Sequence, residues 1–268
     1  AQRQAQDVER LTGEGCAVLP ARDVQFSRAA MSRESAWQRL SVLDGLCAGR
    51  IKVLCASVDA LLDRCAPPAR FQSAAITLSE GSRFPPDRLM DALIRGGYER
   101  VPMVEGRGQC AMRGAIVDVF PANAADALRI EFFDDELDSI RAVDVMSQRS
   151  QGNMQEVVIP PASEAPVPQE GTEELARLLL EALARQEAAA QKGGVQKDDE
   201  ASLADLPLED GEIAAPEVFT RENRTMERFG EKLRAAVGQM QNGVSNRVLE
   251  KFINLLYGQT ETILDYMN

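Results

Sequence analysis

The residue types that usually carry out catalysis are scarce in this sequence. It contains no histidine, so the commonest general base is missing and Ser-His and Cys-His mechanisms are impossible. A serine nucleophile on a G-x-S-x-G turn is also absent. Neither G-x-x-x-x-G-K-[ST] nor G-x-G-x-x-G occurs, so the chain lacks the glycine-rich loops that hold phosphates. We therefore predict no catalytic residue, no cofactor and no enzyme activity in this chain.

Four neighbouring carboxylates could hold a divalent cation, because Mg²⁺ and Ca²⁺ prefer hard oxygen ligands. These are Asp134, Asp135, Glu136 and Asp138. They could also imitate the acidic pair of an ATPase. The simpler interpretation is a solvated acidic turn after a strand, which needs no partner and fits the missing phosphate-binding loop. We adopt it and predict no metal site.

Three residues around one predicted hairpin have the composition of a protein-binding surface. In a strand over ALRIEFF, two-residue alternation places Arg129 and Phe133 on the face opposite the buried apolar residues. The hairpin register brings Arg113 close to the end of that strand, within a residue or two. Arginine and aromatic side chains dominate binding hot spots, since guanidinium forks pair with carboxylates and rings supply rigid apolar area. The pattern fits equally well a partly covered phenylalanine and two ordinary surface arginines.

The elements that would position these residues change character along the chain. Residues 1–70 alternate short apolar runs with helical segments, which predicts a parallel sheet flanked by helices. Ser57 is a predicted helix cap there. Residues 71–160 contain one helix, with prolines at its start and two glycines at its end, and then mostly strands. Two of these strands, joined by a Pro/Asn/Ala/Asp turn, predict an antiparallel hairpin, and IRAVDV near 140–145 extends its sheet.

The C-terminal part is predicted to be mostly helical. A proline-rich stretch at 160–170 precedes a helix over 172–190. Further helices are expected near 217–240 and 245–257, the last capped by Ser245 or Asn246. Residues 192–212 are acidic and poor in large apolar side chains, which predicts an exposed loop.

Composition narrows the class of protein. Acidic residues outnumber basic ones, 42 to 30, so the average field repels phosphate and DNA binding would require a local basic patch. The cysteines are odd in number and form no C-x-x-C pair, as expected for reduced thiols in a cytosolic protein. They are Cys16, Cys47, Cys55, Cys65 and Cys110. No stretch approaches the roughly 20 apolar residues of a membrane span. A soluble, cytoplasmic protein without membrane contacts is predicted.

Several motifs resemble the bacterial transcription-repair coupling factor family (Mfd), in its UvrB-homologous N-terminal part. They are GYER, RGAIVDVFP with the pattern RGxxxDxFP, and RIEFFDDELDSIR followed by SQR. LPARDVQF, SRESAWQRLSVLDGL and ASVDALL upstream, and FINLLYGQTETILDYM at the C-terminus, are also similar to that family. The likeness runs from about residue 15 to the end, interrupted by the acidic segment. A UvrB protein would also carry a phosphate-binding loop and a DNA-gripping hairpin, which are not visible here.

The resemblance implies an α/β fold: an incomplete UvrB-like, degenerate helicase-type parallel-sheet domain with a small inserted α+β domain, followed by C-terminal helices. Residues 1–70 would be the first part of the UvrB-like domain. Residues 71–160 would be the inserted domain, which binds UvrA in this family. Residues 161–268 would return to the first domain, with the acidic loop at 192–212. The first strand-loop-helix of the family's first domain is expected to be missing.

The resemblance also implies a function, the recruitment of UvrA during transcription-coupled nucleotide excision repair by a non-catalytic module. The family's UvrA-binding surface maps onto Arg113, Arg129 and Phe133. ATP hydrolysis and contacts with RNA polymerase and DNA are expected in other domains of the family's longer chain. Two alternatives are a structural or autoinhibitory segment that masks other parts of a parent protein, and a nucleotide- or DNA-dependent helicase-type enzyme domain. UvrA binding would argue against masking alone, and the missing phosphate loop argues against the enzyme.

Overall fold

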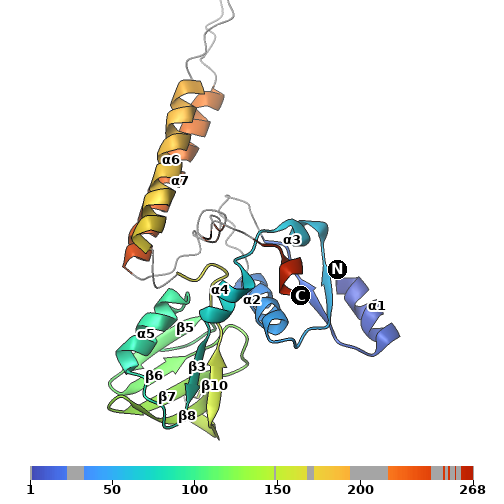
Figure 1. Ribbon diagram of the computed structural model, residues 1–268, viewed down its shortest axis with the longest axis vertical. Helices are drawn as coiled ribbons and strands as arrows, with labels where there is room; N and C mark the ends of the chain where they lie inside the picture. Colours follow the sequence, from blue (N-terminus) through green and yellow to red (C-terminus); the bar gives the residue numbers. More distant parts are fainter. Residues whose placement is uncertain are drawn as a thin grey trace, which may run out of the picture.

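The computed structural model describes residues 2–22, 33–147, 149–167, 172–193, 217–242, 250, 253, 257 and 261–267. Within these residues the chain is a mixed α/β protein (Figure 1). Its helices are α1 (Gln2–Thr12), α2 (Arg33–Cys47), α3 (Val58–Leu62), α4 (Pro68–Ser73), α5 (Pro86–Arg95), α6 (Thr172–Gly193), α7 (Glu217–Gln241) and the 3-10 helix η2 (Ile263–Tyr266). Among the described helices, none is long and apolar enough to cross a membrane.

The strands form three sheets within the described residues. They are β1 (Cys16–Leu19), β2 (Val53–Ala56), β3 (Ile76–Ser79), β4 (Glu99–Arg100), β5 (Gln109–Arg113), β6 (Ile116–Val119), β7 (Ala127–Phe133), β8 (Glu136–Asp144), β9 (Arg149–Met154) and β10 (Glu156–Ile159). Strands β1 and β2 form a parallel pair, and α2 lies between them in sequence, as predicted. The predicted cap is also confirmed, since the Ser57 hydroxyl accepts a hydrogen bond from the backbone N–H of Ala60 at the start of α3.

The largest sheet has six strands in the order β4-β5-β6-β7-β8-β9. All its neighbours are antiparallel except β4 and β5, which are parallel. The predicted hairpin is confirmed as β6 and β7, and β8 continues the sheet as expected. Strands β3 and β10 form a separate two-stranded antiparallel sheet. Its partners Ser79 and Glu156 are 77 positions apart along the chain.

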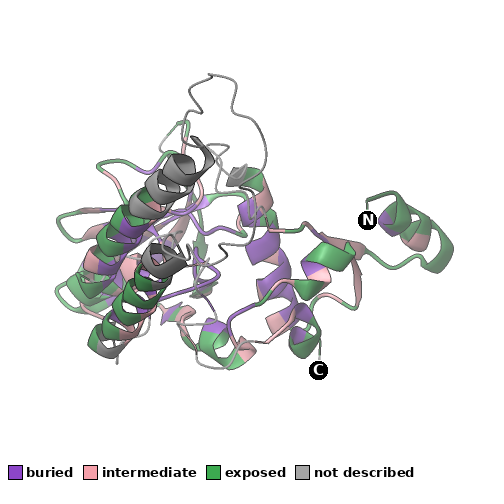
Figure 2. Cartoon of the chain, turned by 90° about the horizontal axis from the view of Figure 1, so that it is seen from above, coloured by how far each residue is buried: buried purple, intermediate pink, exposed green. Residues whose placement is uncertain are grey.

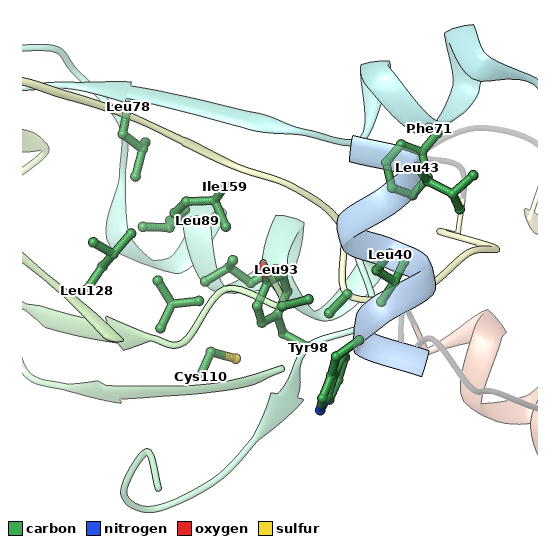
Figure 3. Close-up of a cluster of buried hydrophobic side chains, with 14 of the residues drawn as sticks. Leu40, Leu43, Phe71, Leu78, Leu89, Leu93, Tyr98, Cys110, Leu128 and Ile159 are labelled. Carbon is green, nitrogen blue, oxygen red and sulfur yellow. The ribbon is translucent and has the colours of Figure 1, made fainter. Parts of the chain in front are cut away.

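One apolar core joins this sheet to the first segment of the chain. Leu89 and Leu93 of α5 lie among side chains from β3, β7 and β10, and Figure 3 shows Leu78, Leu128 and Ile159 around them. The core continues through Tyr98, whose hydroxyl donates to the carbonyl of Pro160 at 2.7 Å, towards Leu40 and Leu43 of α2.

Gly108 allows α2 to approach the sheet closely. Its φ of +77° is left-handed, and an added Cβ would lie 2.2 Å from the Trp37 ring atom Cη2. A side chain at position 108 would therefore push α2 away from β5.

A buried ionic cluster ties the segment before β3 to the segment after β10. The guanidinium of Arg39, whose side chain is fully buried, donates from Nε to Glu164 Oε1 at 2.6 Å and from Nη1 to Asp63 Oδ2 at 3.1 Å. Arg22 pairs with the same Glu164 carboxylate. Burial alone raises the pKa of Glu164, but the charges of Arg22 and Arg39 outweigh it and lower that pKa to about 2. The carboxylate therefore stays ionised between the two cations.

The proline-rich stretch predicted at 160–170 is a buried strap over 160–167. Its backbone holds the end of α5, because Ala162 N–H donates to the Gly96 carbonyl at 2.8 Å and Val167 N–H to the Arg95 carbonyl at 2.9 Å.

Helices α6 and α7 follow, and their facing sides are buried while their outer sides are exposed (Figure 2). The bounds predicted for these two helices agree with the structure. Most of the predicted 192–212 loop and of the 245–257 helix, with its caps at Ser245 or Asn246, lies outside the described residues.

Candidate protein-interaction site

Two tight turns place the predicted site residues at one end of the six-stranded sheet. Strand β5 ends at Arg113 and turns back through Gly114, whose φ is +60°. Arg113 is therefore the last residue of an additional strand, whereas the sequence had placed it just before the first strand of the hairpin. The carbonyl of Ala115 in this turn accepts from the N–H of Phe132 at 2.9 Å. The turn after Arg113 thus lies beside the C-terminal end of β7.

Arg113 and Arg129 meet on one carboxylate. Asp118 of β6 is the cross-strand partner of Arg129, and its side chain is 6% exposed. Arg129 donates from Nε to Asp118 Oδ1 at 2.8 Å and from Nη2 to Oδ2 at 3.0 Å, a bidentate pair. Arg113 donates from Nη2 to Oδ2 at 2.6 Å. The hydrogen bonds that Arg129 donates to Asp118 raise the pKa of Arg129, so its guanidinium group stays charged.

The two arginines differ in what they leave open to a partner. The side chain of Arg129 is 15% exposed and is paired with the buried Asp118 of the neighbouring strand. That of Arg113 is 49% exposed, so some of its donors face solvent. The two guanidinium charges and the one carboxylate charge give the Arg113, Asp118 and Arg129 group a net charge of +1. Its hydrogen bonds give it a fixed geometry.

Phe133 is the exposed aromatic residue of this region. It ends β7, and 80% of the residue is exposed to solvent. The alternation predicted along β7 is confirmed: Leu128, Ile130 and Phe132 are buried, while Arg129 and Glu131 are only half-buried. The register shift between β7 and β8 falls next to Phe132, and β7 keeps its two-residue period to its end. Phe133 therefore follows Arg129 and Glu131 along the same face.

Further charges extend this face across β8. Arg141 is the cross-strand partner of Arg129, and its Nη2 lies 3.8 Å from Glu131 Oε2. Glu131 also accepts a hydrogen bond from the Ser139 hydroxyl at 3.1 Å. Two like charges stand opposite each other at Arg129 and Arg141, and each has its own carboxylate. The surface thus alternates positive and negative groups beside an exposed ring.

Another part of the same sheet face is covered and apolar. Val104 packs over Ala111, Ala127 and Val143 in a small cluster that also contains Phe120. The end of the face that carries Arg113, Asp118 and Phe133 lies outside this cluster and is open to a partner. We name this end, defined by Arg113, Asp118, Arg129, Glu131 and Phe133, the β7 patch.

The acidic residues after β7 form a turn. Asp134 and Asp135 are the two central residues between β7 and β8, and the φ of Asp134 is +58°. Aspartate tolerates this left-handed conformation better than most residues. In the described part of the chain, no group of three or more Cys, Asp or Glu side chains is placed to hold a metal ion. The position of Asp134 and Asp135 between β7 and β8 confirms the predicted turn after the strand.

The residue that sequence reasoning missed is Asp118. It lies within the RGAIVDVFP motif, but we had assigned it no role. The available signal was a single charged residue inside an apolar strand, which is costly to bury unless it is paired. Arg129 opposite it supplies that pair.

Comparison with known proteins identifies the region that contains the patch. Residues 76–164 match the family described as the UvrB interaction domain. The chain is 35% identical over 135 residues to the transcription-repair-coupling factor of Haemophilus influenzae, which is 50% of this chain and 12% of that protein. It is 33% identical over 166 residues to that of Bacillus subtilis, 61% of this chain and 14% of the relative. For Escherichia coli the values are 37% over 128 residues, 48% and 11%.

The matched region is thus a small part of these relatives, between 11% and 14% of their length. The β7 patch and both ends of the β3–β10 pair lie inside the matched residues. The resemblance predicted from the motifs is confirmed: residues 76–164 match the family model of the UvrB interaction domain, and the chain is similar to bacterial transcription-repair-coupling factors.

Proposed function

We propose that this chain is a non-catalytic recruiting module that binds UvrA through the β7 patch, in transcription-coupled nucleotide excision repair. The observation that carries the proposal is the shared carboxylate. Asp118 holds Arg113 and Arg129 in place on the face that ends in the exposed Phe133. Pre-ordered arginines beside a rigid ring lose little conformational entropy on binding, which is what a hot spot requires.

The relatives and the matched family support this function. The relatives are named for coupling transcription to repair, and the matched family is named for interaction. RNA polymerase and DNA are proposed as partners of other parts of a longer protein. We assign no cofactor to this chain. ATP would be used by a motor domain outside it.

The domain organisation stays a proposal that follows the sequence. Residues 1–70 and 161–268 would form the UvrB-like, degenerate helicase-type part, and 71–160 the inserted domain. The antiparallel pairing of β3 with β10 supports an insertion, because the chain enters and leaves the six-stranded unit side by side. The parallel pair β1–β2 supports the helicase-type description of the first part.

The sharpest test is the loss of the exposed ring. We expect Phe133→Ala to weaken binding of purified UvrA by roughly 2 kcal/mol or more, as for a central hot-spot residue. Calorimetric titration of the whole chain with UvrA measures this. The matched control is Met146→Ala, since Met146 is an apolar residue that is 92% exposed outside the β7 patch. Equal affinities for the two variants, or no UvrA binding by the unaltered chain, would reject the proposal.

Phe133 is a better probe than Arg129. Charge reversal at Arg129 would place a second carboxylate against the buried Asp118, so a loss of binding could reflect a disturbed sheet. Arg113→Ala is the cleaner arginine variant, because that side chain is half exposed and Arg129 still satisfies Asp118. Circular dichroism of each variant verifies that the sheet is retained.

A further inference from the structure

A second site lies away from the β7 patch, where the strap over 160–167 meets α4 and α5. It is a cavity of about 580 Å³. Its apolar lining includes Ile76, Phe84 and Val167, and Tyr257 closes another side. The Tyr257 hydroxyl donates to the Pro166 carbonyl at 2.9 Å, which fixes the ring beside the strap. This volume lies within the range of small-molecule sites, roughly 300–1,000 Å³.

Three arginines line this cavity: Arg70, Arg88 and Arg95. None of the described residues that line it is acidic. This is unusual in a chain whose acidic residues exceed its basic ones by 12. Positions 88, 92 and 95 lie on one side of α5, so this helix presents two of the arginines along a single stripe. The cavity is a local positive region within an acidic protein.

Arg95 is the least exposed of the three arginines. Its Nε atom is buried and has no hydrogen-bond partner among the described residues. Its backbone carbonyl is fixed by Val167 N–H, so the residue is anchored while its side chain lines the cavity. A buried guanidinium nitrogen without an acceptor costs free energy, and an anion in the cavity would offset that cost by pairing with the charge of the same guanidinium group.

The ends of two helices also contribute to the field. The cavity includes Ser73 at the C-terminal end of α4, and Gly96 just after α5. Helix C-termini carry roughly half a negative charge each. The two helix ends together contribute about one negative charge, whereas the three guanidinium groups carry three positive charges. The cavity therefore keeps a net positive charge of about two.

We propose that this cavity binds a phosphorylated ligand of the size of a nucleoside monophosphate, either free or as the phosphorylated end of a nucleic-acid strand. A phosphate offers three acceptor oxygens and up to two negative charges, which suits three guanidinium groups that line one cavity better than a two-oxygen carboxylate does. The apolar walls with Phe84 and Tyr257 suit the body of such a ligand. The site is independent of the proposed UvrA binding.

Calorimetry of the whole chain with four probes tests this. The probes are inorganic phosphate, adenosine 5′-monophosphate, and one short single-stranded oligodeoxynucleotide with and without a 5′-phosphate. Binding of the monophosphate and of the phosphorylated strand, but not of the unphosphorylated strand, is expected. Preference for the free nucleotide over the strand, or the reverse, identifies the source of the phosphate.

Variants assign the binding to the cavity. Arg88→Ala and Arg95→Ala are each expected to weaken monophosphate binding by roughly tenfold or more, as for hydrogen bonds to a charged group. Arg100→Ala is the matched control, because Arg100 is exposed on β4 outside the cavity and its loss changes net charge equally. Circular dichroism verifies the fold of each variant. Equal weakening by Arg100→Ala, equal binding of the strand with and without its 5′-phosphate, or no binding of any phosphorylated probe overturns the proposal.

Discussion

The β7 patch and the buried ionic cluster share the same arrangement, two arginines on one carboxylate, in opposite surroundings. Around Glu164, the side chains of Arg39 and Arg22 are 0% and 11% exposed. Around Asp118, those of Arg129 and Arg113 are 15% and 49% exposed. The carboxylates themselves are both buried. What differs is how many guanidinium donors remain available.

The partners of the remaining donors show what each cluster does. In the buried cluster, Arg39 also donates to the Pro20 carbonyl at 2.6 Å and to Asp63, so its donors are used within the chain. This arrangement holds together four segments of the chain, those of Arg22, Arg39, Asp63 and Glu164. In the β7 patch the carboxylate orients the arginines and leaves part of Arg113 to solvent. One arrangement therefore stabilises the fold, and the other prepares a surface.

The largest expected effect comes from breaking the buried cluster. Glu164→Ala would leave the fully buried Arg39 with only Asp63 to balance it, and Arg22 would lose its ion-pair partner. Removing one member of a buried ion pair lowers the free energy of unfolding by about 3–5 kcal/mol. Urea denaturation followed by circular dichroism measures this change. A loss below about 1 kcal/mol would show that the cluster contributes little to stability.

Acid should weaken the same cluster without any mutation. The pKa of Glu164 is about 2 in the folded chain, below its ordinary value of 4.5. A carboxylate with a lowered pKa stabilises the fold above its unfolded pKa, and that contribution is lost as the pH falls from about 4.5 towards 2. The difference between the two values corresponds to about 3 kcal/mol. The free energy of unfolding between pH 6 and pH 2, compared with that of Glu164→Gln, measures this loss; parallel curves for the two proteins would contradict the assignment.

The smallest effect on stability is expected at the β7 patch. Asp118→Asn keeps the shape of the side chain and removes its charge, while Arg113 and Arg129 retain access to water. We expect a loss of about 1–2 kcal/mol in the free energy of unfolding, because the lost hydrogen bonds are charge-assisted and the arginines can be hydrated instead. The affinity for UvrA should fall together with the free energy of unfolding, since the arginines lose their fixed orientation. A stability loss as large as that of Glu164→Ala would remove the distinction between the two clusters.

The two clusters also differ in how far sequence could predict them. Alternation along ALRIEFF was enough to place Arg129 and Phe133 on one face, because a strand has a fixed period and β7 keeps it. The hairpin register predicted that Arg113 lies close to Arg129 and Phe133. The structure differs only in making Arg113 the last residue of β5, rather than a residue that precedes a strand. Asp118 was missed because a strand pattern can indicate a charged residue at a buried position but cannot predict which residue pairs with it.

The buried cluster had no local signal in the sequence. Arg39 and Glu164 are 125 positions apart, and only the folded chain brings them together. Glu164 stands in a proline-rich stretch whose composition resembles a linker, yet residues 160–167 are buried along their whole length. Pairings of this kind depend on tertiary packing, so neither periodicity nor capping rules can predict them.

The pairing of β3 with β10 has a practical consequence for the chain as an assembly. Paired strands lie roughly 5 Å apart, so the backbone leaves the six-stranded unit almost where it arrived. A short glycine linker would close that gap, but removal of the unit would expose Leu40 and Leu43 of α2, which share its apolar core. The β7 patch is therefore carried by a unit whose two connections to the rest of the chain lie side by side.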